Sequence, residues 1–196
     1  MADIKQTIQD FYKVAQTRDF ARDFSFRVLD ISNKGVPILT EDDLVLAATA
    51  QLPGKTLPAK DVPYNGFTFR VPGVVEYNNA QAYVISFYCD ANTQARIALE
   101  NWISETYDDA SSTGDGLLHD NSTITLAQLN AKFEVIRTYK LFGVWPQQAG
   151  DIAYDLTQSG EVLKMECTFV YQFFRRDNEL NTAINAVGKL AGAVLG

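Results

Sequence analysis

Residues 43–107 read DLVLAATAQLPGKTLPAKDVPYNGFTFRVPGVVEYNNAQAYVISFYCDANTQARIALENWISETY, and this stretch contains the segments that decide the fold. Their order predicts an apolar strand, a segment punctuated by proline and glycine, a short strand, a strongly alternating strand and an amphipathic helix. The punctuated segment, residues 52–66, is expected to project from the domain as an arm. An arm of this length contributes little to a small monomer, but it suits a subunit that holds a neighbour. The stretch therefore favours assembly over catalysis.

The residue types around the arm indicate which elements are central. Small residues end the strand predicted at 44–52, where they permit close approach of another backbone. Prolines keep the arm out of the middle of a sheet, because proline has no backbone N–H to donate. Asn65-Gly66 predicts a hairpin turn, and the strand at 81–90 is apolar on both faces, which indicates a central position.

Further helices and strands are predicted by the spacing of apolar residues. A helix at 93–105, with Asp90 or Asn92 as N-cap, is expected to pack across an open sheet face. Its buried stripe is predicted to be Ala95, Leu99, Trp102, Ile103 and Tyr107. The other predicted elements are helices at 3–17 and 178–194 and strands at 22–31, 131–143 and 162–174. Phe24 is expected on the buried face of the strand at 22–31, and Trp145-Pro146 is expected to end the strand at 131–143. The first helix is expected either to pack on its own domain or to face a partner.

Length and composition fit one domain covering residues 1–196, with a helical segment at 1–20 and a helical extension at 178–196. Hydrophobic residues make up 46% of the chain, which excludes a disordered protein. No apolar run approaches the about 20 residues that span a bilayer. The first residues do not read as a signal peptide, so no membrane anchor is expected.

The net charge is −7, and the basic residues are scattered along the chain. Tight binding of nucleic-acid phosphates is therefore not expected. A protein of this charge that meets DNA should repel the DNA backbone rather than hold it.

The two cysteines, Cys89 and Cys167, both lie in predicted strands. A secreted disulfide scaffold would carry more cysteines. Both are interpreted as buried free thiols, and a cross-link between them or between subunits is the alternative.

Catalytic and metal-binding motifs are absent from the sequence. The single histidine, His119, lies in a polar loop at 108–121 and is interpreted as a solvated side chain. A hydrolase that uses Ser111 or Ser112 with His119 is the enzymatic alternative, but no triad motif supports it. Four loop carboxylates do not follow the EF-hand spacing of a calcium site: Asp108, Asp109, Asp115 and Asp120. We expect no enzymatic activity, cofactor or metal.

Three runs of sequence resemble one known family. They are LVLAATAQLPGKTLPAKDVPYNGFTF, AYVISFYCDANTQARIALENW and YKLFGVWPQQAGDIAYDLTQSGEVLKMECTFVYQFF. In this order they resemble the tail tube protein of contractile-tailed, T4-like bacteriophages, whose superfamily includes bacteriocin tube proteins and the ring protein of type VI secretion. Their sharpest marks are the alanine-rich strand leading into Leu52-Pro53-Gly54, the pair Asn101-Trp102, and the turn Gly143-Val144-Trp145-Pro146.

The resemblance implies a mainly β fold with flanking helices, a two-sheet antiparallel sandwich whose inner strands complete a barrel when six subunits form a ring. Stacked rings would enclose a channel for DNA, in a virion tail assembled in the host cytoplasm. The implied partners are copies of the chain itself, tail sheath protein, tape measure protein, and baseplate and tail terminator proteins. A secreted type VI ring and a baseplate tube-initiator are the alternatives, and the second stays open because the helix from residue 178 exceeds the family's usual terminus.

Two sets of residues are predicted to serve this assembly. The arm offers apolar anchors to a neighbouring subunit, and these contact residues are Leu52, Pro53, Leu57, Pro58, Val62 and Tyr64. A channel that conducts DNA must not bind it, so the wall is expected to favour acidic and small polar side chains. Candidates for the wall are Glu76, Glu134 and Glu166, for which an outer surface facing sheath or solvent is the alternative.

Overall fold

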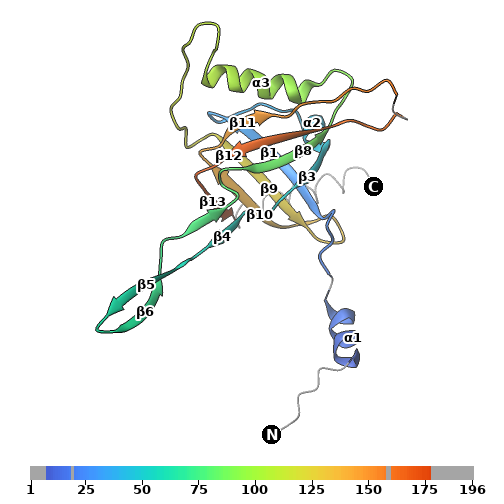
Figure 1. Ribbon diagram of the computed structural model, residues 1–196. Helices are drawn as coiled ribbons and strands as arrows, with labels where there is room; N and C mark the ends of the chain where they lie inside the picture. Colours follow the sequence, from blue (N-terminus) through green and yellow to red (C-terminus); the bar gives the residue numbers. More distant parts are fainter. Residues whose placement is uncertain (1–7, 19, 158–159, 178–196) are drawn as a thin grey trace.

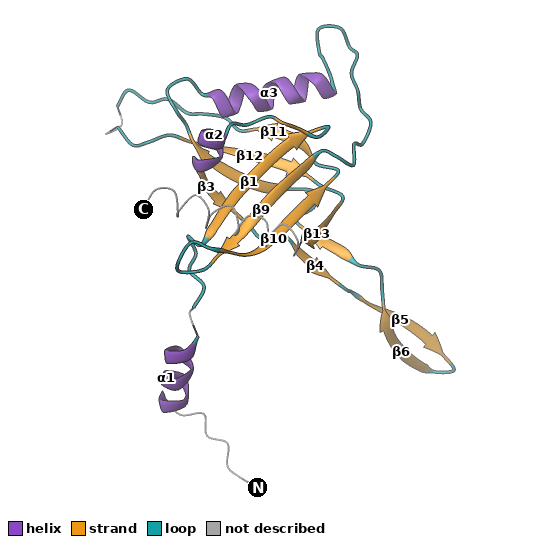
Figure 2. Cartoon of the chain, turned by 180° about the vertical axis from the view of Figure 1, so that it is seen from behind, coloured by secondary structure: helices purple, strands orange, loops and turns teal. Residues whose placement is uncertain are grey.

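The computed structural model describes residues 8–18, 20–157 and 160–177. Two antiparallel sheets form a sandwich (Figures 1 and 2). The five-stranded sheet has the order β13 (Phe173–Asp177), β10 (Val135–Phe142), β9 (Thr123–Leu129), β1 (Phe26–Asn33) and β2 (Val36–Pro37). The four-stranded sheet has the order β11 (Trp145–Ala149), β12 (Lys164–Val170), β8 (Tyr83–Tyr88) and β3 (Ala47–Ala50). The predicted mainly β, two-sheet fold is confirmed.

The core lies between the sheets and is built from alternate residues of their strands. Tyr83, Ile85 and Phe87 of β8 are at most 1% exposed, as the period-two pattern predicts. One cluster joins them to residues of both sheets, among them Val28, Ile31, Ile124, Leu126, Leu141, Met165, Cys167 and Phe169. Each buried large side chain contributes about 1.5–3 kcal/mol, so this cluster is the main source of stability.

Helix α3 (Gln94–Thr106) lies beside β11 at the edge of the four-stranded sheet, rather than across the middle of a sheet face (Figure 1). Leu99 and Trp102 enter the core, and the Trp102 ring centroid lies 6.4 Å from that of Phe169. The set of buried residues predicted for this helix is too large, because Ile103 is half-buried and Tyr107 is exposed.

The start of α3 differs in part from the prediction. Thr93 occupies the N-cap position in the left-handed region, with φ 51°, and makes no side-chain cap. The Asp90 carboxylate accepts hydrogen bonds from the backbone N–H groups of Asn92 and Gln94, at 3.1 Å each. Asp90 therefore satisfies donors at the helix start from outside the N-cap position.

The predicted arm is the first half of a longer β-hairpin. Its base pairs β4 (Gly54–Thr56) with β7 (Glu76–Asn78), and its outer part pairs β5 (Ala59–Tyr64) with β6 (Phe67–Pro72). Asn65 and Gly66 form the tip with φ of 52° and 84°, the positive values that Asn-Gly hairpin turns require. We call residues 54–78 the arm hairpin. It projects away from the sandwich, on the side opposite α3 (Figures 1 and 2).

The strand predicted at 44–52 is shorter, because a helix precedes it. Helix α2 (Glu41–Val45) begins with a capping box, in which the Thr40 hydroxyl accepts from the Asp43 N–H and the Asp43 carboxylate accepts from the Thr40 N–H. This reciprocal cap favours a helix at the acidic residues 41–43, so only residues 47–50 join the sheet.

Four other parts of the prediction need correction. No strand is predicted at residues 123–129, which form β9 in the middle of the five-stranded sheet. The strand predicted at 162–174 is two strands, β12 and β13, which lie in different sheets. Trp145-Pro146 begins β11 rather than ending β10. Strand β1 begins at Phe26, so Phe24, expected on the buried face, precedes the strand and is 61% exposed.

The helices predicted near the two ends have different outcomes. Helix α1 (Ile8–Thr17) confirms the described part of the first, and each of its residues is exposed, so packing on its own domain is wrong for this part. The helix predicted at 178–194 lies outside the described residues. Within the described ranges, none of the helices has the length and apolar character needed to cross a bilayer.

Both cysteines are free thiols, and the structure allows their reactivity to be predicted. Burial raises the pKa of the Cys167 thiol to about 12, and burial followed by the nearby Asp90 carboxylate raises the pKa of Cys89. Because the thiolate is the reactive form, we expect a thiol reagent at pH 8 to label the half-buried Cys89 slowly and Cys167 only after unfolding. Rapid labelling of both cysteines in the folded protein, or a ladder of multimers on gels without reductant, would contradict this assignment.

Candidate assembly interface

The arm hairpin exposes more apolar surface than an isolated pair of strands is expected to show. Every residue of β5 and β6 is exposed. The exposed large apolar residues of the hairpin are Leu57, Val62, Tyr64, Phe67, Phe69, Val71, Val74 and Val75. A two-stranded hairpin alone is marginally stable in water, so a surface of this kind indicates a contact with another molecule.

The predicted contact residues divide by burial. Leu52, Leu57, Val62 and Tyr64 are exposed and available for a contact, whereas Pro58 is half-buried and Pro53 is buried within its own chain. The prediction missed the returning strand, where Phe67 and Phe69 are 72% and 56% exposed. The alternation of Phe67, Thr68 and Phe69 was the signal for this second row of apolar side chains.

The base of the arm hairpin is held firmly against the sandwich. The Tyr171 hydroxyl donates to the Asn78 carbonyl oxygen at 2.8 Å, and the Thr56 hydroxyl donates to the Asn78 side-chain oxygen at 2.7 Å. Farther out, Gly73 N–H donates to the Pro58 carbonyl at 2.7 Å, and a Cβ on Gly73 would lie 2.6 Å from that oxygen. Glycine is therefore required at this crossing.

The outer faces of the two sheets differ in charge. The four-stranded sheet presents Glu166 and Thr168 together with Lys164, and the buried Ser86 pairs with Glu166. The five-stranded sheet presents Lys140 and Arg175 opposite one another, each over an aromatic ring of the stacked pair Phe142–Phe173. The four-stranded face therefore fits a wall that does not retain phosphates better than the five-stranded face does.

The three candidate wall residues lie on different elements. Glu166 lies on the outer face of β12, Glu76 at the base of the arm hairpin, and Glu134 in the connection before β10, where it accepts from the Asn130 side chain at 2.9 Å. All three are exposed. Of the three, Glu166 is the one that lies on a sheet face among other polar residues.

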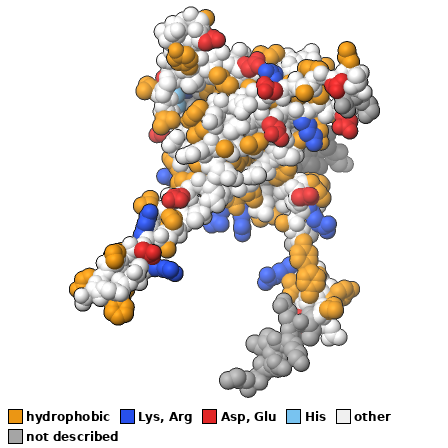
Figure 3. Space-filling view, in the orientation of Figure 1, with side chains coloured by type: hydrophobic (Ala, Val, Ile, Leu, Met, Phe, Trp, Pro, Cys, Tyr) orange, Lys and Arg blue, Asp and Glu red, His pale blue; other side chains and the backbone are white. Residues whose placement is uncertain are grey.

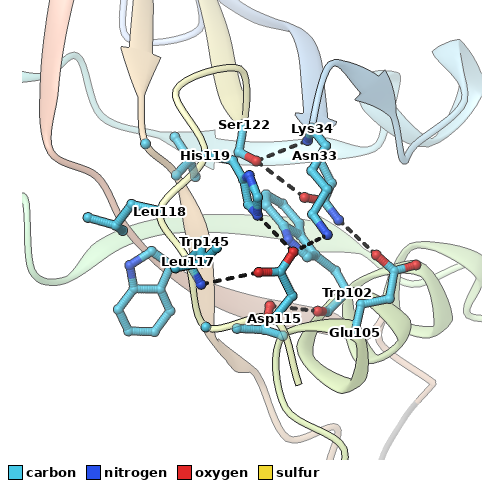
Figure 4. A pocket seen from close by; sticks show the side chains of 14 residues that line it. Asn33, Lys34, Trp102, Glu105, Asp115, Leu117, Leu118, His119, Ser122 and Trp145 are labelled. Atoms are coloured by element: carbon cyan, nitrogen blue, oxygen red, sulfur yellow. Dashed lines mark hydrogen bonds and ion pairs between the residues drawn. The ribbon is translucent and has the colours of Figure 1, made fainter. Parts of the chain in front are cut away.

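A cavity of about 280 Å³ lies between the end of α3, the segment 115–122 and the start of β11 (Figure 4). His119 lines this cavity, so its interpretation as a solvated side chain without a partner is wrong. Its Nε2 donates to Asp115 Oδ2 at 3.0 Å, and Lys34 Nζ donates to the same oxygen at 2.8 Å. These bonds fasten the long polar loop to the turn after β1.

The other polar groups of the cavity also bond to one another. Asn33 Nδ2 donates to Glu105 Oε2 at 2.9 Å, and Ser122 Oγ donates to Asn33 Oδ1 at 3.2 Å. The arrangement does not support the enzymatic alternative, which would pair Ser111 with His119. The Ser111 Oγ hydrogen-bonds to Asp108 and Thr113, and His119 hydrogen-bonds to Asp115 instead. Within the described ranges, no group of three or more His, Cys, Asp or Glu side chains could hold a metal ion.

The Asp115 carboxyl should fasten this loop in a pH-dependent way. Hydrogen bonds from Lys34 and His119 lower its pKa to about 2. Because the pKa is lower in the folded state, the stabilisation is complete above the unfolded value of about 4 and is lost as the pH falls through 2. We expect Asp115→Asn to lower, at neutral pH, the amide-exchange protection factors of residues 115–121, after correction for the intrinsic rate at each pH, to the values that the parent reaches only in strong acid. Equal exchange rates in both proteins at neutral pH would contradict this role.

With this geometry described, comparison with known proteins decides the family. The family described as phage tail tube protein matches residues 15–177. The chain belongs to this family. Membership indicates a structural, tube-forming role and confirms the resemblance seen in the sequence. The match includes the sandwich and the arm hairpin but begins within α1, so the first part of this helix lies outside the tail tube match.

Solved structures agree with this tail tube fold. The sheath/tube terminator of an extracellular contractile injection system, PVC, has a TM-score of 0.55 at 14% identity, covering 82% of this chain and 98% of its own. A chain of the PVC sheath-tube complex has a TM-score of 0.50 at 14% identity, covering 88% and 99%. The tube terminating cap of the anti-feeding prophage has a TM-score of 0.50 at 13% identity, covering 82% and 92%. No curated protein matches the chain.

Proposed function

We propose that this chain is the repeating subunit of the tail tube of a contractile-tailed bacteriophage. Hexameric rings of the chain stack into a tube, and DNA passes through its channel. The observation that carries the proposal is the projecting arm hairpin with exposed apolar rows on both strands, in a chain of the tail tube family. A surface of this kind suits a repeated contact between copies.

The proposed partners follow from the same assembly. Sheath protein surrounds the tube, a tape measure protein occupies it during assembly, and baseplate and terminator proteins close its ends. The tube forms in the host cytoplasm and leaves in the virion. This part of the proposal draws on sheath-tube and terminator structures as neighbours in fold.

A tube terminator or secreted ring protein of an injection system that carries no DNA is the second candidate. It is favoured by the injection-system proteins among the neighbours with TM-scores of 0.50 and above. Negative-stain images of the purified protein distinguish the candidates, because a tail tube subunit should form long filaments as the concentration rises. Isolated rings at every concentration and salt condition would contradict the phage tube and favour the second candidate.

The channel wall is proposed to be the outer face of the four-stranded sheet, with Glu166 among its residues. The double variant Glu166→Lys, Thr168→Lys should assemble normally but retain DNA at low salt, because each ring then presents a band of positive charge to the channel. Glu134→Lys changes an exposed acid away from this sheet face and should not retain DNA. A filter-binding assay on assembled tubes measures both. Retention by Glu134→Lys but not by the double variant would contradict this choice of wall.

A further inference from the structure

The tip of the arm hairpin presents an aromatic pair to solvent. Tyr64 and Phe67 flank the Asn65-Gly66 turn and are 70% and 72% exposed. They are a cross-strand pair, so their rings extend from one position at the far end of the hairpin. Aromatic side chains with two rotatable bonds are effective anchors, because they bury a large area at a low cost in conformational entropy.

The cavity beside α3 has the size and the walls that such an anchor requires. Its apolar lining comes from Trp102, Val144 and Trp145, and from Leu117 and Leu118, which are 75% and 62% exposed and so mark its solvent side. A cavity of about 150 Å³ accommodates one benzene ring, and this one measures about 280 Å³. Exposed leucines beside two tryptophans are suited to receive an apolar side chain.

The charges around the two surfaces are of opposite sign. The region of the cavity is acidic, since Glu105 and Asp115 line it and the adjoining loop carries Asp108, Asp109 and Asp120, against Lys34 as the lining cation. The outer hairpin carries Lys60 and Arg70 against Asp61. Such complementarity guides association and fixes register more than it raises affinity.

The two surfaces lie on opposite sides of the subunit. The arm hairpin leaves the sandwich away from α3 (Figures 1 and 3), whereas the cavity is lined by residues at the end of α3. Residues 54–64, as extended backbone, reach about 35 Å outwards, which is roughly the width of a domain of this size. A contact between the tip and the cavity therefore joins two copies head to tail, and this kind of contact repeats along a stack.

We propose that Tyr64 and Phe67 of one copy insert into the cavity between α3 and segment 115–122 of a second copy. The proposal rests on the proposed function, because it requires a head-to-tail assembly, and it specifies which surface of the neighbour receives the arm hairpin. Leu117, Leu118 and Trp145 then contact the inserted rings, while Asp115, held by Lys34 and His119, keeps the opening in place.

Cysteine cross-linking tests this contact in assembled protein. A variant with Phe67→Cys and Leu118→Cys should give a ladder of multimers on non-reducing gels after mild oxidation, since the two positions meet only between copies. Each single variant should give no ladder, and neither should Phe67→Cys combined with Leu156→Cys, which changes a still more exposed leucine elsewhere. Rings or filaments in which Phe67→Cys, Leu118→Cys gives no ladder, or in which the Leu156 pair gives one, would overturn the inserted-tip proposal and leave the proposed function standing.

A matched pair of substitutions gives a second readout. Leu118→Asp places a charge at the opening and should raise the concentration at which assemblies form by about tenfold or more, corresponding to about 1.4 kcal/mol. Leu156→Asp makes the same change on a fully exposed leucine and should have little effect. Equal assembly of both variants would overturn the contact. A parent chain that stays monomeric under all conditions would overturn both this proposal and the proposed function.

Discussion

Replacing residues 57–75 with Asn-Gly should yield a folded monomer that no longer forms rings or tubes. Thr56 and Glu76 are paired across the base of the arm hairpin, so a two-residue turn can close the shortened hairpin without disturbing the sandwich. The removed segment carries eight of the chain's exposed large apolar residues: Leu57, Val62, Tyr64, Phe67, Phe69, Val71, Val74 and Val75. Each anchor that becomes well buried in an assembly contributes about 1–3 kcal/mol, so losing the whole set should abolish association.

Circular dichroism tests whether the shortened chain is folded, and sedimentation velocity tests whether it is monomeric. The far-ultraviolet spectrum should keep its β signature, and the protein should sediment as one monomeric species. The control variant Tyr64→Ala, Phe67→Ala keeps the hairpin backbone and removes only the tip, so it should weaken assembly less than the replacement does. Normal tubes from the shortened chain would show that the arm hairpin does not join the subunits.

Phe169→Ala should destabilise the subunit by about 3–5 kcal/mol, because it leaves a cavity where the sheets meet α3. Phe169 is fully buried, pairs with Tyr83 and Pro146 on the neighbouring strands, and contacts the Trp102 ring. The matched change Phe67→Ala removes an exposed ring and should alter the free energy of unfolding by less than about 0.5 kcal/mol.

Urea denaturation of the monomeric, shortened chain measures the effect of Phe169→Ala on the free energy of unfolding without interference from assembly. The effect of Phe67→Ala is measured in the full chain at low concentration, because the shortened chain lacks residue 67. The two substitutions should therefore have different effects, because Phe169 is needed for folding and Phe67 for assembly. Similar losses of stability for both substitutions would contradict the placement of the core and of the tip.

The elements that the sequence predicted best are those whose local pattern agrees with their environment. Strand β8 alternates and is central, and Asn65-Gly66 forms the expected turn. Helix α3 was found within one residue at each end. In each case a short-range rule and the tertiary packing favour the same structure, so neither overrides the other.

The missed elements have identifiable causes. Residues 123–129 alternate in Ile124 and Leu126, but the threonines between them hide the apolar pattern, although Thr123 and Thr125 are buried too. The split between β12 and β13 has no signal in periodicity, because alternation continues through Tyr171 while the chain passes from one sheet to the other. Helix α2 could have been found from its capping box at Thr40 and Asp43.

The candidate interface was predictable in part for a similar reason. The sequence identified Leu57, Val62 and Tyr64 as contact residues, because apolar residues among several prolines are unusual in a single segment. The cavity beside α3 could not be found in this way, since its lining combines residues from Asn33 to Trp145, which only the fold brings together. The pair His119–Asp115 is four residues apart, but nothing in a loop sequence shows that the two side chains face one another.

An electron cryo-microscopy reconstruction of the assembled protein tests the central claim most directly, because it locates the arm hairpin and the two sheets in one measurement. We expect stacked six-fold rings, with the outer face of the β11-β12-β8-β3 sheet lining the channel and each arm hairpin lying on a second copy. Rings in which the arm hairpins extend freely into solvent, or particles without rotational symmetry, would contradict the account of this chain as a tube subunit joined through its arm hairpin.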